Sequence, residues 1–583
     1  MTARNSSDPT VDHRCLPTTH PPLKATGLRL SVCTPHPLSL SRSTRPLRGL
    51  RSRPPPFRRV ERPERAKRVE GLRPARKARQ LPSESRAPHN AATEPDFISP
   101  ARTQSTSVFI QGGAIQVLSG STPYGRGPLR STSFGACGEE GRSRLLPGEG
   151  IADISRRSIQ MAMTDRLAID GGTPVRRTPL LPGWPGGLLI GEEEKAAVLE
   201  VIESQSLFRH YGPRPLHRAA SLEKAFAQAM GARHALAVTS GTAALITALA
   251  ALGIGPGDEV AVPTYTWIAT INAVVILGAV PLFVDIDESL NMDASALAAA
   301  VTPYTRAVIP VHMRGAPANL APILETARTH HLSVVEDTAQ AVGGRYRGRR
   351  LGTWGQFGAY SLQYHKTITT GEGGLVTSSD PVLFERAVRF HDQGSVRMEE
   401  LDLLIAGDSP LIIGINFRMG ELPAAVGLAQ LRKMDWIIDS MRANARRIRH
   451  AIEDIPGLTF RTLYDEEGET GATVIFFVPT AAQADRFARA LAAENLPASV
   501  PWWSGQHVYN HFDQIINRRL LSTRKCSWEC PHYKGGATLQ KGQFPRTDAI
   551  LQRAVHLDVH PLFTDQDISD ITAGIHKVAQ AVL

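Results

Sequence analysis

One lysine has neighbours that could make it a nucleophile. Lys366 stands in "GAYSLQYHKTITTGEGGLV", between a predicted strand and a Gly-rich turn, and Ser361 precedes it by five residues. Most lysines are solvated surface cations, which is the plainer interpretation of this one. A lysine beside an ordered strand can instead be partly desolvated, which lowers its pKa and leaves a neutral amine. Because neutral amines attack carbonyl carbons, the stretch predicts imine chemistry at Lys366.

Two further stretches could hold an anion and a cation. "SGT" at 240–242 follows an apolar run, and the free N–H groups of a helix that begins there would favour a phosphate. In "VVEDTAQAVGG", Asp337 and Gln340 come just after a second apolar run. Ligands bind at that edge of open α/β sheets, so Asp337 could pair with a buried cation. Each stretch could also be an ordinary helix N-cap.

A fourth stretch, "GINFRMGELPAAVGLAQL", places Asn416 and Arg418 before a helix predicted to start near Glu421. Polar side chains at the start of a helix can contact a ligand, and a polar loop ahead of a core helix is the alternative.

The segments between these stretches alternate between strand and helix patterns. Short apolar runs such as "HALAVT", "EVAVP", "VPLFVDI", "AVIPVH", "LSVVED" and "LVTSS" predict buried strands. Longer runs such as "AALITALAAL", "TWIATINAVVIL", "NLAPILETARTHH" and "PVLFERAVRFHDQG" predict helices between them. This alternation predicts an α/β fold with a mostly parallel sheet and helices on both faces.

The chain divides into three predicted regions. Residues 161–433 form a large domain that starts with the helical segment "GEEEKAAVLEVIES". Residues 434–583 contain a long basic helix, the strand "ATVIFFVP" and the helix "AQADRFARALAAENL", which predict a smaller α+β domain. Residues 1–160 are rich in Arg, Pro and Ser without apolar periodicity, so we expect them to be disordered.

Three origins remain open for residues 1–160. The segment could bind anionic partners, act as a transit peptide, or result from a start codon placed too far upstream, with Met161 or Met163 the true start. The abrupt change of composition at "MAMTDRLAIDGG" favours the last.

The net charge of +11 is confined to one end of the chain. Residues 1–160 hold 27 Lys and Arg against 12 Asp and Glu, a net charge of +15, so the remainder carries −4. The basic isoelectric point therefore does not predict nucleic-acid binding by the globular part. We expect neither a membrane span nor a secretory signal, because no apolar run is long enough for a bilayer and Pro and polar residues interrupt the first thirty positions. With five scattered cysteines, a reducing, cytoplasmic location is expected.

Taken together, the four stretches resemble one family. "SGTAAL", "EDTAQA", the serine and lysine ahead of "GEGG", and "GINFRMGELPAA" occur in the order and at the spacings of the DegT/DnrJ/StrS sugar and cyclitol aminotransferases. The resemblance covers about residues 165–583. It implies the fold-type I architecture of the aspartate aminotransferase superfamily, with a seven-stranded type of sheet and the cofactor pyridoxal 5′-phosphate (PLP).

The resemblance also implies a role for each matched position. Lys366 would carry PLP as a Schiff base, and Asp337 would pair with the pyridinium nitrogen and strengthen the ring as an electron sink. Gly241, Thr242 and Ser361 would hold the phosphate, and Gln340 would bind near the phenolic oxygen. Trp267 would stack on the ring face, although an ordinary core aromatic is the alternative for it. Asn416 would reach the phosphate of the neighbouring subunit, which implies a homodimer with shared active sites.

The position of the lysine favours transamination. Some family members have histidine there and are sugar dehydratases, but the spacing to the Gly-rich turn places Lys366, not His365, at the Schiff-base position. Glutamate or glutamine is the expected donor, and a keto-sugar or keto-cyclitol the acceptor, with a lean toward cyclitols from "SLQ" and "KCSWECPHYKG". Arg209, Tyr211 and the "QYH" around Tyr364 are candidate pocket residues.

No metal site is predicted, because Cys526, Cys530 and His532 lack a fourth ligand. Two other functions stay open. One is a PLP-dependent dehydratase or epimerase on the same fold. The other is a non-catalytic PLP-dependent regulator whose basic arm binds DNA, although that arm shows no helix-turn-helix pattern.

Overall fold

The computed structural model describes residues 107–111, 114–118, 166–183, 185–395, 412–520 and 527–583. Within the first 136 residues, the described part is one antiparallel pair, β1 (Ser107–Gln111) and β2 (Ala114–Leu118). This pair is not expected from the sequence analysis. The rest of the segment predicted to be disordered lies outside the described residues.

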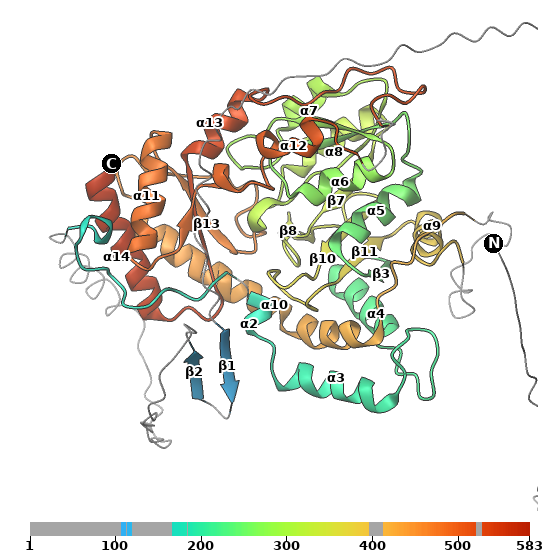
Figure 1. Ribbon diagram of the computed structural model, residues 1–583, viewed down its shortest axis with the longest axis horizontal. Coiled ribbons are helices and arrows are strands. Elements are labelled where there is room, and N and C mark those ends of the chain that lie inside the picture. The colour runs from blue at the N-terminus through green and yellow to red at the C-terminus, as the bar shows by residue number, and fades with distance from the viewer. Residues whose placement is uncertain (1–106, 112–113, 119–165, 184, 396–411, 521–526) are drawn as a thin grey trace, which may run out of the picture. The chain divides into compact units, whose positions relative to one another are not determined.

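A seven-stranded sheet forms the centre of the second unit, and its strands follow the order β3-β11-β10-β7-β6-β4-β5 (Figure 1). Strand β11 is antiparallel to both of its neighbours, and the other pairs are parallel. The prediction of a mostly parallel α/β sheet is therefore confirmed. The strands are β3 (His234–Val238), β4 (Glu259–Pro263), β5 (Val280–Val284), β6 (Thr305–Val308), β7 (Ser333–Asp337), β10 (Phe357–Ser361) and β11 (Gly374–Ser378).

Helices cover both faces of this sheet, because its buried strands are apolar on both sides. In β4, Val260 and Val262 belong to the core around α5 (Gly241–Leu252), α6 (Ile268–Ile276) and α9 (Pro381–His391). The intervening Ala261 belongs to a second core with α7 (Ala294–Ala300) and α8 (Leu320–Thr329). Neighbouring residues of a strand point to opposite faces, so two helical layers enclose the sheet.

A second, antiparallel sheet has the order β12-β13-β15-β14. It consists of β12 (Thr459–Phe460), β13 (Thr473–Phe477), β15 (Ala554–Asp558) and β14 (Ala498–Ser499). Helices α11 (Ala481–Ala493), α13 (Pro545–Arg553) and α14 (Asp565–Val582) accompany it. Short elements complete the unit: η1 (Ala168–Asp170), α2 (Pro185–Leu188), η2 (Met313–Gly315), β8 (Arg345–Tyr346), β9 (Arg349–Arg350), η4 (Pro501–Trp503), η5 (Tyr509–His511) and α12 (Asp513–Ile516).

One helix runs between the two sheets. Helix α10 (Glu421–Ile452) packs against α3 (Glu192–Ser204) and α4 (Arg218–Met230), then against α14 and β13 (Figure 1). The sequence pattern predicts two helices here with a domain boundary after residue 433, and that boundary falls inside α10. Because "QLRKMDWIIDS" has no Gly or Pro to end a helix, the two patterns join. The division into domains stays a prediction.

No helix in the described part of the chain has both the length and the apolar character needed to cross a membrane.

Candidate active site

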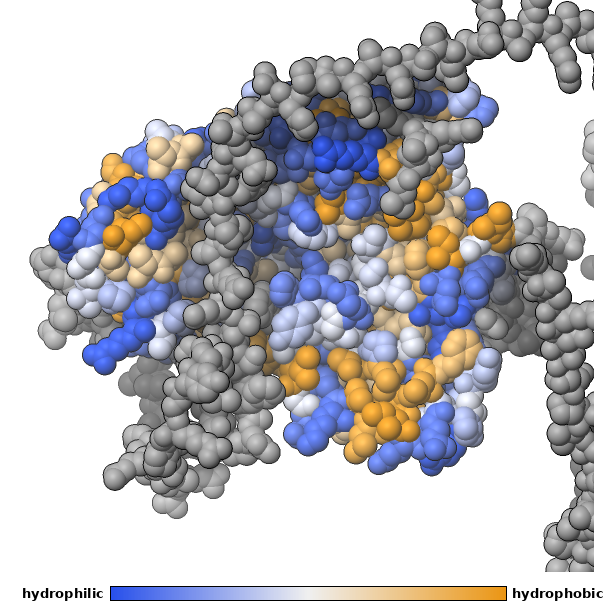
Figure 2. Space-filling view, in the orientation of Figure 1, coloured by the Kyte–Doolittle hydropathy of each residue, from blue (hydrophilic) through white to orange (hydrophobic). Residues whose placement is uncertain are grey.

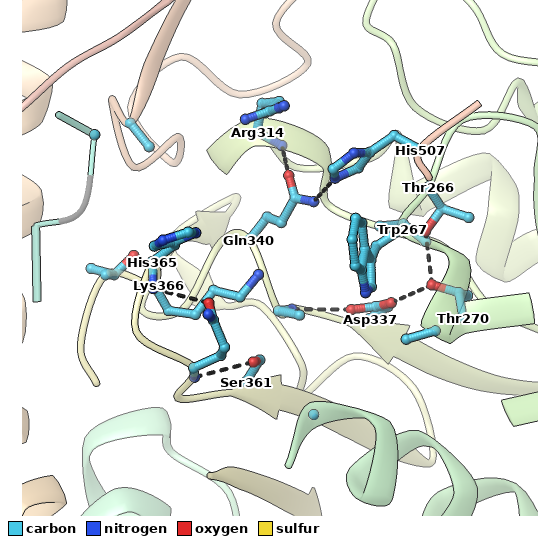
Figure 3. Close-up of a pocket in the computed structure, with 18 of the residues that line it drawn as sticks. Thr266, Trp267, Thr270, Arg314, Asp337, Gln340, Ser361, His365, Lys366 and His507 are labelled. Carbon is cyan, nitrogen blue, oxygen red and sulfur yellow. Dashed lines mark hydrogen bonds between the residues drawn. The ribbon is translucent and has the colours of Figure 1, made fainter. Parts of the chain in front are cut away.

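A cavity of about 610 Å³ lies at the carboxyl ends of the parallel strands, the edge where α/β proteins bind ligands. Figure 3 shows how side chains from β7, β10 and the loops beyond them point into it. Seven of the eight predicted cofactor ligands line this cavity: Gly241, Thr242, Trp267, Asp337, Gln340, Ser361 and Lys366. Residues that are more than 100 positions apart in the sequence thus share one site.

One corner of the cavity is suited to a phosphate. Ser240 caps helix α5, and its hydroxyl oxygen accepts a hydrogen bond of 3.0 Å from Ala243 N. Gly241 begins the helix, and a Cβ there would lie 2.7 Å from the Cβ of Ser361, so only glycine permits this close approach of helix and strand. The N-terminus of a 12-residue helix and the Ser361 hydroxyl therefore face the same corner, where the helix dipole favours an anion.

A buried carboxylate lies on the other side of the cavity. Asp337 ends β7, and its side chain accepts hydrogen bonds from Thr270 Oγ1 at 2.8 Å and Ala339 N at 3.1 Å. The Thr270 hydroxyl also contacts that of Thr266 at 2.8 Å. Burial raises the pKa of Asp337, although these hydrogen bonds and the charge of Lys366 oppose the shift. A positive group placed against Asp337 would favour its ionised form.

An indole and an amide border the space between these two ends. Trp267 is the N-cap residue of α6, and 44% of it is exposed, which leaves a ring face open to the cavity. Gln340 accepts a hydrogen bond of 3.2 Å from Arg314 N through Oε1, and its Nε2 lies 3.4 Å from His507 Nε2 (Figure 3). The Trp267 and His507 rings are 4.8 Å apart. A flat ring could therefore stack on Trp267 with its edge toward Gln340.

Lys366 lies in the loop after β10, and backbone hydrogen bonds fix both its N–H group and its carbonyl group. Its N–H donates to Gln363 O at 2.9 Å, and its carbonyl oxygen accepts from Gly186 N at 3.2 Å. Burial lowers the pKa of the Lys366 amine and Arg314 lowers it further, whereas Asp337 and Glu372 act in the opposite direction. A lysine with a lowered pKa has more neutral amine near pH 7, which is the form that attacks a carbonyl carbon.

Some candidates from the sequence lie elsewhere. Asn416 is exposed and does not line the cavity of its own chain, so its role toward a neighbouring subunit stays a prediction. Arg209 does not line the cavity either, because its guanidinium is buried in an ion pair with Glu223 at 2.9 Å. Tyr211 is 69% exposed and lies outside the cavity lining.

Two other predicted stretches, "QYH" at 363–365 and the cysteine cluster near residue 530, can also be compared with the structure. Of the "QYH" stretch that the sequence predicts to line the pocket, Gln363 and His365 do line the cavity, whereas Tyr364 is not part of its lining. In the cysteine cluster, Cys530 is buried and His532 exposed, while Cys526 lies outside the described residues.

Sequence reasoning missed three ionisable residues that line the cavity: Arg314, His507 and Asp558. Arg314 follows the strand "AVIPVH", so the edge rule that selects Asp337 could have found it. His507 and Asp558 come from beyond residue 500, and no local pattern indicates that this part of the chain returns to the first sheet. Backbone bonds from Thr266 N to His507 O and from Ile268 N to Gln506 O, both 2.9 Å, bring it there.

Comparison with known proteins identifies the family of the chain. Residues 189–530 match the DegT/DnrJ/EryC1/StrS aminotransferase family. The chain is 33% identical over 435 residues to L-glutamine:2-deoxy-scyllo-inosose aminotransferase of Micromonospora echinospora, covering 71% of this chain and 97% of that protein. It is 46% identical over 214 residues to GDP-perosamine synthase of Caulobacter vibrioides, covering 36% of this chain and 56% of that enzyme.

Solved structures give the same result for the fold. The crystal structure of 3-amino-5-hydroxybenzoic acid synthase superposes with a TM-score of 0.57 and 29% sequence identity, covering 70% of this chain and all of that one. The family match over residues 189–530 and the relative that is matched along 97% of its length lead to one conclusion: the chain belongs to the DegT/DnrJ/EryC1/StrS aminotransferase family.

Proposed function

We propose that the cavity binds PLP and that the protein transfers an amino group from glutamine or glutamate to a keto-cyclitol or keto-sugar. The observation that carries this proposal is the joint presence of Lys366, buried Asp337 and the Gly241 corner in one cavity. PLP carries an aldehyde, a phosphate and a ring nitrogen, and it supplies an electron sink for bonds at an amine-bearing carbon.

Each end of the cavity fits one of these groups. Lys366 is the attachment point for the aldehyde, because its amine is buried and its pKa lowered. The N-terminus of α5 and Ser361 suit the phosphate. Asp337 suits a protonated ring nitrogen, whose positive charge would favour the ionised form of a carboxyl group that burial alone disfavours. With the cofactor bound, the Lys366 amine would be the group that takes up and returns the proton of the substrate's amine-bearing carbon.

The substrate class rests on relatives. One is named for transfer from L-glutamine to 2-deoxy-scyllo-inosose and matches along 97% of its length, and another is named for GDP-perosamine synthesis. The longer match favours a cyclitol acceptor over a nucleotide-linked sugar.

The proposal is tested by incubating the PLP-loaded protein with glutamine or glutamate and a panel of keto-cyclitols and nucleotide-linked keto-sugars. Mass spectrometry should find a new amine on one acceptor class, together with the 2-oxo acid of the donor. Acceptor turnover without any 2-oxo acid would instead indicate a dehydratase or epimerase. Salt-sensitive DNA binding without turnover would indicate a regulator.

We also propose a homodimer in which Asn416 contributes to the neighbouring site. Asn416 is exposed on its own chain, and apolar side chains gather over α3, where Leu199 and Ile202 are 51% and 54% exposed (Figure 2). Exposed apolar clusters of this kind are typical of contact surfaces.

Mixing two inactive variants tests the shared site. Lys366→Ala and Asn416→Ala should each be impaired alone, and after unfolding and refolding together the mixture should regain roughly a quarter of native activity. This follows because half of randomly assembled symmetric dimers are hybrids, and each hybrid has one intact site of two. Recovery of no activity, with hybrids present by mass spectrometry, would contradict the shared site.

A further inference from the structure

The proposed function leaves one cation of the cavity without a task. Arg314 lines the cavity together with Lys366, above Gln340 and away from Ser361 in the view of Figure 3. Its guanidinium stays protonated at physiological pH and offers donors in a planar fork. The Nε atom is buried and has no hydrogen-bond partner among the described residues. Such a group is costly to bury unless a ligand completes its bonds.

The backbone holds Arg314 in a conformation that side-chain-bearing residues rarely adopt. Its φ is 52° and its ψ 41°, in the left-handed region. Three contacts fix it: Gln340 Oε1 accepts from its N–H at 3.2 Å, and Arg461 donates to the carbonyl oxygens of Met313 and Arg314 at 3.2 and 3.0 Å. Left-handed backbone at a non-glycine residue costs about 1–3 kcal/mol and is concentrated at ligand sites.

Asp558 is the acid that faces this arginine. Its Oδ1 lies 3.9 Å from Arg314 Nη1, which is too long for a hydrogen bond, and its side chain is 44% exposed. Asp558 ends β15 and lines the same cavity. The negative charge of Asp558 therefore partly offsets the positive charge of Arg314, but Asp558 makes no hydrogen bond to the N–H donors of the guanidinium.

Donor and acceptor must use this cavity in turn, and they differ in charge. Glutamine and glutamate carry an α-carboxylate on the carbon that bears the amine, whereas a keto-cyclitol is neutral. Arg314 and Lys366 line the same cavity, so a carboxylate on the carbon whose amine lies next to Lys366 would lie in the space that Arg314 borders.

On the basis of the proposed function, we propose that Arg314 binds the α-carboxylate of the amino-acid donor and that Asp558 is its counter-ion when the neutral acceptor is bound. The fork of Arg314 matches a carboxylate in two parallel hydrogen bonds, which a single charge on lysine does not. When the donor leaves as a 2-oxo acid, Asp558 again offsets the charge of Arg314, and the polyol enters a cavity with less free charge.

The test measures binding to the PLP-loaded protein by the change in its visible spectrum. The probes are 2-methylglutamine, which has the α-carboxylate but no α-hydrogen to lose, and 4-aminobutanamide, which keeps the amine and the amide at the same spacing but has neither the carboxylate nor the methyl group. Arg314→Asn removes the charge, and asparagine tolerates the left-handed backbone, so folding should be retained. We expect this variant to raise the Kd of 2-methylglutamine about 10- to 100-fold, the range for a hydrogen bond to a charged group.

Three controls make the result specific. The Kd of 4-aminobutanamide should be the same for Arg314→Asn as for the native protein, and Arg314→Lys should give an intermediate Kd for 2-methylglutamine. Asp558→Asn removes the competing carboxylate, so it should lower the Kd of 2-methylglutamine about two- to fivefold, as for a partly exposed ion pair.

Several outcomes would overturn the inference. If Arg314→Asn raised the Kd of both probes equally, or left the Kd of 2-methylglutamine unchanged, Arg314 would not be the residue that binds the carboxylate. Weaker binding of 2-methylglutamine by Asp558→Asn would exclude Asp558 as a competing counter-ion. If the native protein acquires no visible absorption with PLP, the proposed function fails as well, which separates the two.

Discussion

Lys366→Ala should abolish both turnover and the visible absorption that PLP gives when it is joined to a lysine. The side chain is the predicted point of attachment and the predicted proton carrier, so its removal takes away two contributions to rate. Loss of general acid–base catalysis alone costs about 10²- to 10⁴-fold. Borohydride treatment followed by peptide mass spectrometry should find the cofactor fixed to Lys366 in the native protein and to no residue in the variant.

The control for this prediction is the neighbouring His365→Ala, which removes another cavity side chain and should keep the absorption and the borohydride product. The pH dependence of cofactor capture gives a second check. An amine is neutral above its pKa, and the pKa of Lys366 is lowered mainly by burial. Capture by the cofactor-free protein should therefore be half-maximal below pH 10.4, the approximate pKa of an ordinary lysine. A midpoint at or above that pH would contradict the buried amine.

Asp337→Ala should retain PLP but use it poorly. Without the carboxylate, the ring nitrogen loses the charge that keeps it protonated, so the ring withdraws electrons less well. We expect turnover to fall about 10²- to 10³-fold, as when a single electrostatic stabiliser is removed from an active site. Cofactor binding should weaken about 10- to 100-fold through loss of a charged hydrogen bond. Turnover and equilibrium dialysis of PLP measure the two effects.

A matched variant separates the charge from its surroundings. Thr270→Val removes the hydroxyl that donates to Asp337 at 2.8 Å and keeps the carboxylate. It should reduce turnover much less than Asp337→Ala. Equal losses for the two variants would mean that the hydrogen-bond network matters rather than the negative charge.

The sequence predicts the parts of the molecule that depend on local pattern. Short apolar runs identify the strands of the large sheet, and the edge rule for parallel strands selects Asp337 and Gln340. Glycine at 241 has a local reason as well, since the helix begins there and the backbone must approach a ligand. These features depend on residues that are close in sequence, so the pattern carries them.

Long-range features are not visible in that pattern. The backbone pairing that brings His507 to Thr266 joins segments 241 residues apart, and neither segment has a motif that indicates the other. Asp558 reaches the cavity as the last residue of a strand in the second sheet. The continuation of α10 past residue 433 is missed for another reason. The sequence there has no residue that would end a helix, but the change of composition suggests a domain boundary that the helix does not respect.

Because the cavity includes His507 and Asp558, its wall is finished late in protein synthesis. Lys366 leaves the ribosome 141 residues before His507, a delay of roughly 10–30 s at usual translation rates. During that interval the reactive amine belongs to a nascent chain whose enclosing segment has not yet been made. The completed cavity is thus a property of the released protein, and its ability to retain a small molecule should arise only when translation approaches the C-terminal strand.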